Sequence, residues 1–121
     1  LADPELLVGL CAKQVPCGQY ASEALELVDI EASVDTFESD ARSLTTKLAI
    51  GELDVGVVYA TDAASRADDI AVIGTLDGAD VRYPIASVMD APQPESAAAF
   101  VEFVLSPAGQ AILADHGFLA P

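Results

Sequence analysis

The chain has 121 residues, 52% of them hydrophobic, and its 20 acidic residues against 5 basic ones give a net charge of −15. This apolar content excludes intrinsic disorder, because disordered chains are poor in apolar residues. The longest apolar runs, at 55–60 and 97–101, fall far short of the roughly 20 residues that a bilayer span requires. The acidic excess argues against nucleic acid and anionic membrane surfaces as partners, because both are bound largely through Lys and Arg.

Strand and helix patterns alternate along the chain. Apolar and β-branched runs predict strands at residues 6–11, 30–37, 55–59, 70–75 and 83–88. Apolar residues at helical spacing predict helices at 18–28, 40–50 and 61–66. Ser39 or Asp40 caps the second of these helices and Gly51 ends it, and Thr61 or Asp62 caps the third. Alternating strands and helices predict an α/β fold.

Two helices in tandem, at 96–105 and 107–116, are predicted to close the chain. Ser106 is placed to cap the second helix, Pro107 occupies its first position and Gly117 follows its end. A turn is expected at 77–80, between the last two predicted strands. The closing helices carry apolar faces that need a partner, so we expect self-association through residues 95–116 if nothing covers them.

The sequence offers no catalytic constellation. His116 is the single histidine, and its place at a helix end suits a dipole-complementing role better than that of a base or ligand. Asp68 and Asp69 are neighbours on a predicted loop, so their carboxylates point in different directions. The acidic residues are spread along the chain, and no cluster has the spacing of a calcium loop. We therefore expect neither an enzyme nor a metal site.

Cys11 and Cys17 are the two cysteines, separated by a loop that contains Pro16. A disulfide across this loop is the favoured interpretation, and two buried free thiols are the alternative. Closing so short a loop contributes only about 2 kcal/mol by the loop-entropy model, so its main effect is on the shape of the loop. An oxidised pair indicates a location outside the cytosol.

Three chain segments could together bind a small anion. Residues 15–18 and 39–41 open two predicted helices, whose first amides have no acceptor within the helix. Tyr59 ends a predicted strand and brings a hydroxyl to the same edge. In a parallel α/β sheet the helices begin at the carboxyl ends of the strands, where helix N-termini attract anions. This pattern permits an anion site at Cys17, Ala41 and Tyr59 without requiring one.

Several motifs resemble the periplasmic molybdate-binding proteins of ABC transporters, the ModA family. They are Val15-Pro16-Cys17-Gly18-Gln19-Tyr20-Ala21, residues 51–63 with Val57-Val58-Tyr59-Ala60-Thr61-Asp62-Ala63, Tyr83-Pro84-Ile85-Ala86, and residues 100–119 with Ser106-Pro107-Ala108-Gly109. The last motif is shared with other binding proteins of this class. The first two are more particular to molybdate binders, and together the matches cover nearly the whole chain.

The resemblance implies one lobe of a two-lobed type II binding-protein fold that clamps an oxyanion between its lobes. Residues 1–83 would form the second lobe, and 84–121 would return to the first lobe. The implied ligands of molybdate or tungstate are the amides of Cys17 and Ala41 and the hydroxyl of Tyr59, with no cofactor. Arg42, beside Ala41, would add long-range attraction or simply be a solvated helix charge.

The first lobe of the family supplies further hydroxyl donors, and its residues are not in this sequence. The chain begins at Leu1 and enters an apolar run almost at once, so we expect an N-terminal portion to be missing and this chain alone to bind weakly. The implied partner is a membrane permease, at an extracytoplasmic location. The alternatives are a binding protein for another oxyanion such as sulfate, and the effector-sensing domain of a transcriptional regulator with a related lobe.

Overall fold

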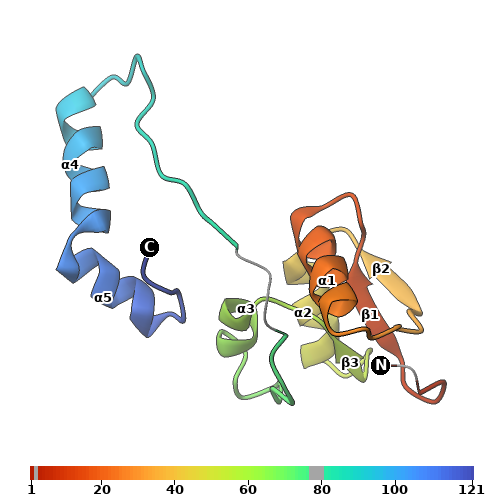
Figure 1. The fold of residues 1–121 in the computed structure, drawn as a ribbon. Helices are drawn as coiled ribbons and strands as arrows, with labels where there is room; N and C mark the ends of the chain where they lie inside the picture. The colour runs from red at the N-terminus through yellow and green to blue at the C-terminus, as the bar shows by residue number, and fades with distance from the viewer. Residues whose placement is uncertain (2, 77–80) are drawn as a thin grey trace. The chain divides into compact units, whose positions relative to one another are not determined.

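The structure is a computed structural model that describes residues 1, 3–76 and 81–121. The chain divides into two compact units, Leu1–Val81 and Arg82–Pro121, and each is described by itself (Figure 1). The first unit contains a small sheet with helices. The second contains a pair of helices.

β1 (Val8–Cys11) is the central strand of a three-stranded parallel sheet of order β2-β1-β3. β2 (Thr36–Glu38) pairs along one edge with Gly9 opposite Thr36, and β3 (Val55–Gly56) pairs along the other with Val8 opposite Val55. All residues of β1 are buried, which is typical of a parallel strand covered on both faces. The predicted α/β fold class and its first strand are confirmed.

Three helices follow the three strands in turn: α1 (Pro16–Leu27), α2 (Ala41–Ala49) and α3 (Ala60–Ala64). Neighbouring residues of a strand point to opposite faces of the sheet. Leu10 accordingly packs with Ala21 and Leu25 of α1, whereas Cys11 belongs to a second core cluster with Leu44 of α2. α1 and α2 therefore bury their apolar sides against opposite faces of the sheet.

Two glycines let α2 approach the sheet closely. Gly9 and Gly56 are paired between β1 and β3, and a Cβ added at Gly9 would lie 2.9 Å from Leu44 Cδ1. Gly51 ends the helix with a φ of +73°, in the left-handed region where glycine is favoured. The predicted end of this helix is confirmed.

An ion pair joins α2 to β2. Lys47 Nζ lies 2.7 Å from Oε1 of Glu38, whose side chain is largely buried. The hydrogen bond from Lys47 holds the pKa of Glu38 below its ordinary value, and the same contact raises the pKa of Lys47. Both ionised forms are therefore favoured in the folded protein, which ties the exposed end of α2 to the edge strand.

Three predicted strands are shorter in the structure, and the one expected at 6–11 begins at Val8. The strand expected at 30–37 is confined to β2, because the Ile30 and Ser33 amides donate to the carbonyls of Leu25 and Leu1, outside the sheet. The strand expected at 55–59 ends at Gly56, and Val57 packs against the α1 side of the core without a ladder partner among the described residues. Short apolar runs alone did not reveal where the ladder stops.

The strands predicted at 70–75 and 83–88 are wrong. Val72, Ile73 and Val88 are exposed, and the described part of the chain places no hydrogen-bonding strand beside either segment. A strand is stable only when a neighbour satisfies its amides and carbonyls. The turn predicted at 77–80 lies outside the described residues.

The second unit contains α4 (Pro94–Leu105) and α5 (Pro107–Asp115). The predicted cap is confirmed, since Ser106 Oγ accepts from the Gly109 amide at 3.2 Å, and Gly117 follows the helix with a φ of +85°. α4 begins two residues earlier than predicted, at Pro94. The Tyr83 and Phe118 rings meet edge to face, with centroids 5.7 Å apart.

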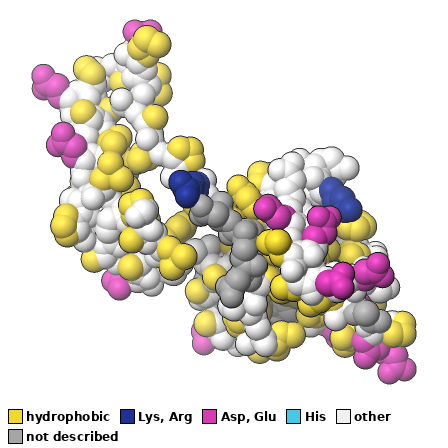
Figure 2. Space-filling model, in the orientation of Figure 1, with side chains coloured by type: hydrophobic (Ala, Val, Ile, Leu, Met, Phe, Trp, Pro, Cys, Tyr) yellow, Lys and Arg dark blue, Asp and Glu magenta, His cyan; other side chains and the backbone are white. Residues whose placement is uncertain are grey.

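Apolar side chains of α4 and α5 are left uncovered within this unit. α4 has no buried residue, and Phe100 is 60% exposed. Figure 2 shows the apolar side chains over these helices in yellow; the exposed large ones are Phe100, Phe103, Leu105 and Ile112. No single helix in the described residues could cross a membrane, although α4 and α5, bent by 63°, together have the length and composition of a span.

Candidate functional site

The Cys17 amide lies in the first turn of α1. Val15 is the N-cap and has an extended backbone, no side chain caps the helix, and Pro16 has no N–H. The amides of Gly18 and Gln19 both donate to the Val15 carbonyl. Among the described residues the Cys17 N–H has no backbone acceptor, so it is one of the amides that a helix start leaves available.

A disulfide links Cys11 to Cys17, which confirms the predicted pairing. The Cα atoms are 5.7 Å apart, and the bond joins the end of β1 to the first turn of α1. Gly18 makes this close approach possible, because a Cβ at that position would lie 2.6 Å from the Cys11 carbonyl oxygen. The cysteines and the glycine thus fix α1 against the end of the central strand.

The Ala41 amide lies at the start of α2. Asp40 is the N-cap, as predicted, and its Oδ1 accepts from the Ser43 amide at 2.8 Å. The Ser43 amide, with the Ser39 and Ser43 hydroxyls, holds the pKa of Asp40 below its ordinary value. Among the described residues the Ala41 N–H has no backbone acceptor, so this helix start also presents a donor, next to an ionised cap.

Tyr59 is the N-cap of α3, and the amides of Asp62 and Ala63 donate to its carbonyl. The prediction that Thr61 or Asp62 caps this helix is therefore wrong. The helix begins earlier because Tyr59 itself has an extended backbone. The Tyr59 ring meets the Tyr20 ring of α1 edge to face, with centroids 6.4 Å apart.

All three residues proposed from the sequence contact one core cluster. Cys17 belongs to the buried cluster of Cys11, Cys17, Leu44 and Leu53, and Ala41 and Tyr59 both pack against that cluster. The starts of α1, α2 and α3 therefore meet at one end of the sheet. His116 follows α5 in the other unit and belongs to no such group.

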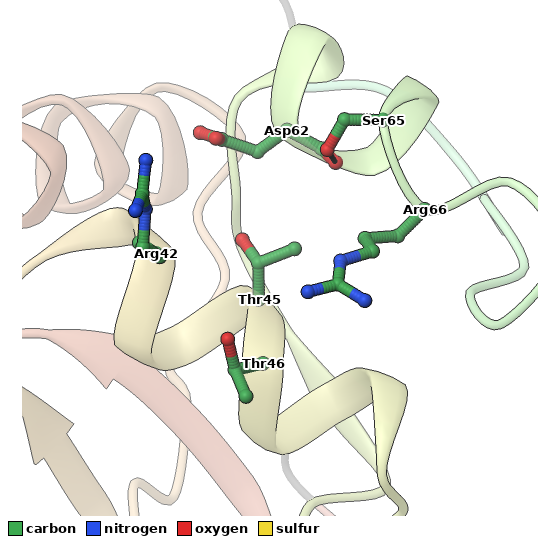
Figure 3. Close-up of a pocket in the computed structure, with 6 residues that line it drawn as sticks. All are labelled: Arg42, Thr45, Thr46, Asp62, Ser65 and Arg66. Atoms are coloured by element: carbon green, nitrogen blue, oxygen red, sulfur yellow. Dashed lines mark hydrogen bonds between the residues drawn. The ribbon is translucent and has the colours of Figure 1, made fainter.

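A polar pocket of about 290 Å³ lies between α2 and α3. Figure 3 shows the side chains that line it: Arg42, Thr45 and Thr46 of α2, Asp62 of α3, and Ser65 and Arg66, which follow α3. The α2 residues are spaced at i, i+3 and i+4, which places their side chains on one helix face. That spacing was the signal available in the sequence. Sequence analysis considered Arg42 as a charge and Asp62 as a cap, and it missed the pocket.

The pocket has a specific electrostatic arrangement. Burial raises the pKa of Asp62, and the nearby Arg42 opposes that effect. The Thr45 hydroxyl donates to the Ala41 carbonyl at 2.7 Å, and the Ser65 hydroxyl donates to the Asp62 carbonyl at 2.7 Å. The first of these bonds lies in the first turn of α2, and the second lies at the end of α3. No group of three metal-ligating side chains occurs in the described ranges.

The structure is a parallel α/β lobe in which residues at the starts of three helices contact one core cluster. The family model for bacterial extracellular solute-binding proteins matches residues 1–119, and the chain belongs to that family. Such proteins are transport components that bind their solute without catalysis or a cofactor.

The resemblance to ModA proteins is confirmed by individual relatives. The chain is 32% identical to the molybdate-binding protein ModA of Mycobacterium tuberculosis, over all of this chain and 47% of that protein. It is 31% identical to ModA of Haemophilus influenzae and 28% identical to a putative ABC transporter substrate-binding lipoprotein, YvgL, of Bacillus subtilis, in each case over 99% of this chain and 48% of the relative. The chain thus spans about half the length of these curated relatives. No solved structure matches it significantly.

Proposed function

We propose that this chain is the second lobe and return segment of an extracytoplasmic solute-binding protein that delivers molybdate or tungstate to an ABC permease. The observation that carries the proposal is the packing of Cys17, Ala41 and Tyr59 against one buried cluster. The ligand assignment is supported by relatives that are described as molybdate-binding proteins.

The proposed site holds a dianion with neutral donors. A hydrogen bond to a charged acceptor contributes about 1.5–3 kcal/mol, and an amide or hydroxyl donor avoids the desolvation of a buried counter-charge. A site made of donors also rejects a protonated oxyanion, which needs an acceptor. The net charge of −15 does not prevent this, because salt screens charges beyond roughly 8 Å at physiological ionic strength.

Two segments of the chain, divided close to the boundary between the compact units, have separate roles in this proposal. Residues 1–83 form the lobe that carries the three donors, and residues 84–121 return to a first lobe supplied by another part of a longer protein. The exposed Phe100 and Phe103 faces of α4 support this, because large apolar side chains favour a covering surface. If that surface is absent, residues 95–116 should drive self-association, which light scattering of the 121-residue chain would reveal as a dimer or larger species.

An extracytoplasmic location is supported by two independent observations. The matching family is described as extracellular, and one relative is described as a lipoprotein. The Cys11–Cys17 disulfide is stable in an oxidising compartment, whereas the cytosol keeps such pairs reduced. The same disulfide disfavours the cytosolic regulator that the sequence left open.

Calorimetric titration of the longer protein with molybdate, tungstate and sulfate tests the proposal. We expect tight binding of molybdate and tungstate, weaker binding of sulfate, and a loss of about 10- to 100-fold in affinity for Tyr59→Phe, the cost of one bond to a charged acceptor. Tyr83→Phe, which removes an exposed hydroxyl at the last residue of this lobe and outside the compact unit Leu1–Val81 that holds the three donors, is the matched control and should leave the affinity unchanged. The absence of both heat and thermal shift with all three oxyanions would refute the proposal.

A further inference from the structure

The helix starts that carry the two amide donors are anchored in different ways. α2 is anchored by the Asp40 cap at its beginning and by the Lys47–Glu38 ion pair near its end. α1 has no side-chain cap, no acidic residue in its first turn and no basic residue in its last turn. Its start therefore depends on a different attachment to hold the Cys17 amide in place.

The loop between β1 and α1 is tied to the sheet at its beginning but not at its end. The Ala12 amide donates to the Glu38 carbonyl of β2 at 2.8 Å, which fixes the first loop residue. The later bonds, from Val15 to Ala12 and from Gly18 to Val15, are local turns that follow the loop wherever it goes. Among the described contacts, the disulfide is the one covalent cross-link, besides the loop backbone itself, between the sheet and the first turn of α1.

The disulfide also lies inside the cluster on which the site is built. Cys11 is 2% exposed and Cys17 is 8% exposed, and both pack with Leu44 and Leu53. Ala41 and Tyr59 pack against this same cluster. A shift of Cys17 relative to β1 would therefore change the position of its amide with respect to the other two donors.

We propose that the Cys11–Cys17 disulfide is the positioning element of the oxyanion site, holding the Cys17 amide toward the bound anion. This inference rests on the proposed function. Cys11 acts through Cys17 and does not touch the ligand. Reduction by a dithiol or a phosphine adds two electrons and two protons and converts the disulfide to two thiols. The freed loop then samples positions in which the Cys17 amide no longer points at the anion, and the affinity falls.

The test compares oxidised, reduced and reoxidised forms of the longer protein by titration with molybdate. We expect reduction to weaken binding on the order of ten-fold, the effect of impairing one charge-assisted bond, and reoxidation to restore it. In the molybdate-bound protein, reduction should accelerate hydrogen exchange at the Cys17 amide, whose acceptor is then the anion, while the amides of α2 keep their protection. A purely structural role would instead change exchange throughout the lobe.

Two variants complete the design. The double variant Cys11→Ala/Cys17→Ala should bind as the reduced protein does and should not respond to reductant. Lys13→Gln, on the exposed part of the same loop, should bind as the oxidised protein does. If the reduced protein unfolds, the molybdate affinity of the double variant is compared with that of the oxidised protein instead, because the small apolar alanine side chains preserve the packing.

The outcomes separate the inference from the function on which it rests. Equal affinity of the oxidised protein and the double variant, or unchanged exchange at the Cys17 amide of the molybdate-bound protein, overturns the inference and leaves the proposed function intact. Absence of binding by the oxidised protein overturns the proposed function and the inference together. A ten-fold loss on reduction, reversed on reoxidation, supports both.

Discussion

The substitution Leu44→Ala probes the packing that holds α2, and with it the Ala41 amide, against the sheet. Leu44 is completely buried, and its Cδ1 lies above Gly9 and Gly56 of the paired strands β1 and β3. The change removes Cγ and both Cδ atoms and leaves a cavity floored by backbone. Glycine backbone in a sheet cannot collapse into that cavity. The substitution should therefore lower the free energy of unfolding by about 3–5 kcal/mol, the upper part of the range for buried leucines.

Urea unfolding followed by circular dichroism measures this loss. For a unit of the size of Leu1–Val81, the free energy of unfolding falls by about 1 kcal/mol for each molar increase in urea. The urea concentration at the midpoint of unfolding should therefore fall by about 3 M or more. Leu27→Ala is the matched control, because Leu27 is 62% exposed and the same change should cost less than about 1 kcal/mol. Equal losses for the two variants would refute the packing of α2 described here.

Three further predictions concern the same unit. Gly18→Ala should destabilise it by about 1–3 kcal/mol in thermal or urea unfolding, because the new Cβ meets the backbone of β1 and of the following loop. Gly74→Ala is the control and should be neutral, because Gly74 has open space around it. The Glu38–Lys47 pair should add stability that is lost as pH falls through the lowered pKa of Glu38, below 4.5, and as pH rises through the raised pKa of Lys47, above 10.5. A Glu38→Gln variant whose stability has the same pH dependence as the parent would contradict this. Asp40→Asn should keep the helix cap and increase molybdate affinity, because it removes a negative charge beside the site. Asp40→Ala removes the cap as well and should lower the melting temperature. Equal melting temperatures for the two variants would argue against the cap.

Sequence patterns predicted the local features of the fold well. The buried strand β1, the stop at Gly51 and the cap at Ser106 all follow from interactions within a few residues of each position. The disulfide was favoured for the same reason, since Cys11 and Cys17 flank one short loop. These features need no information about distant parts of the chain.

Features that depend on distant partners were predicted poorly. The apolar runs at 70–75 and 83–88 have strand composition but no neighbouring ladder in the described residues. The pocket between α2 and α3 needs the relative placement of two helices, which a pattern within either helix does not give. Cys17, Ala41 and Tyr59 could be grouped from the sequence because topology alone brings the starts of these helices to one end of a parallel sheet, and all three contact one core cluster in the structure.

The most direct test of the proposed site is to follow the backbone amides of the isotope-labelled longer protein by NMR during titration with molybdate. If these two amides bind the anion, the amide protons of Cys17 and Ala41 should show the largest downfield shifts of this lobe and become protected from exchange. Gly51, whose amide already donates to Leu48, should not move. Saturable binding that leaves Cys17 and Ala41 unshifted would contradict the account.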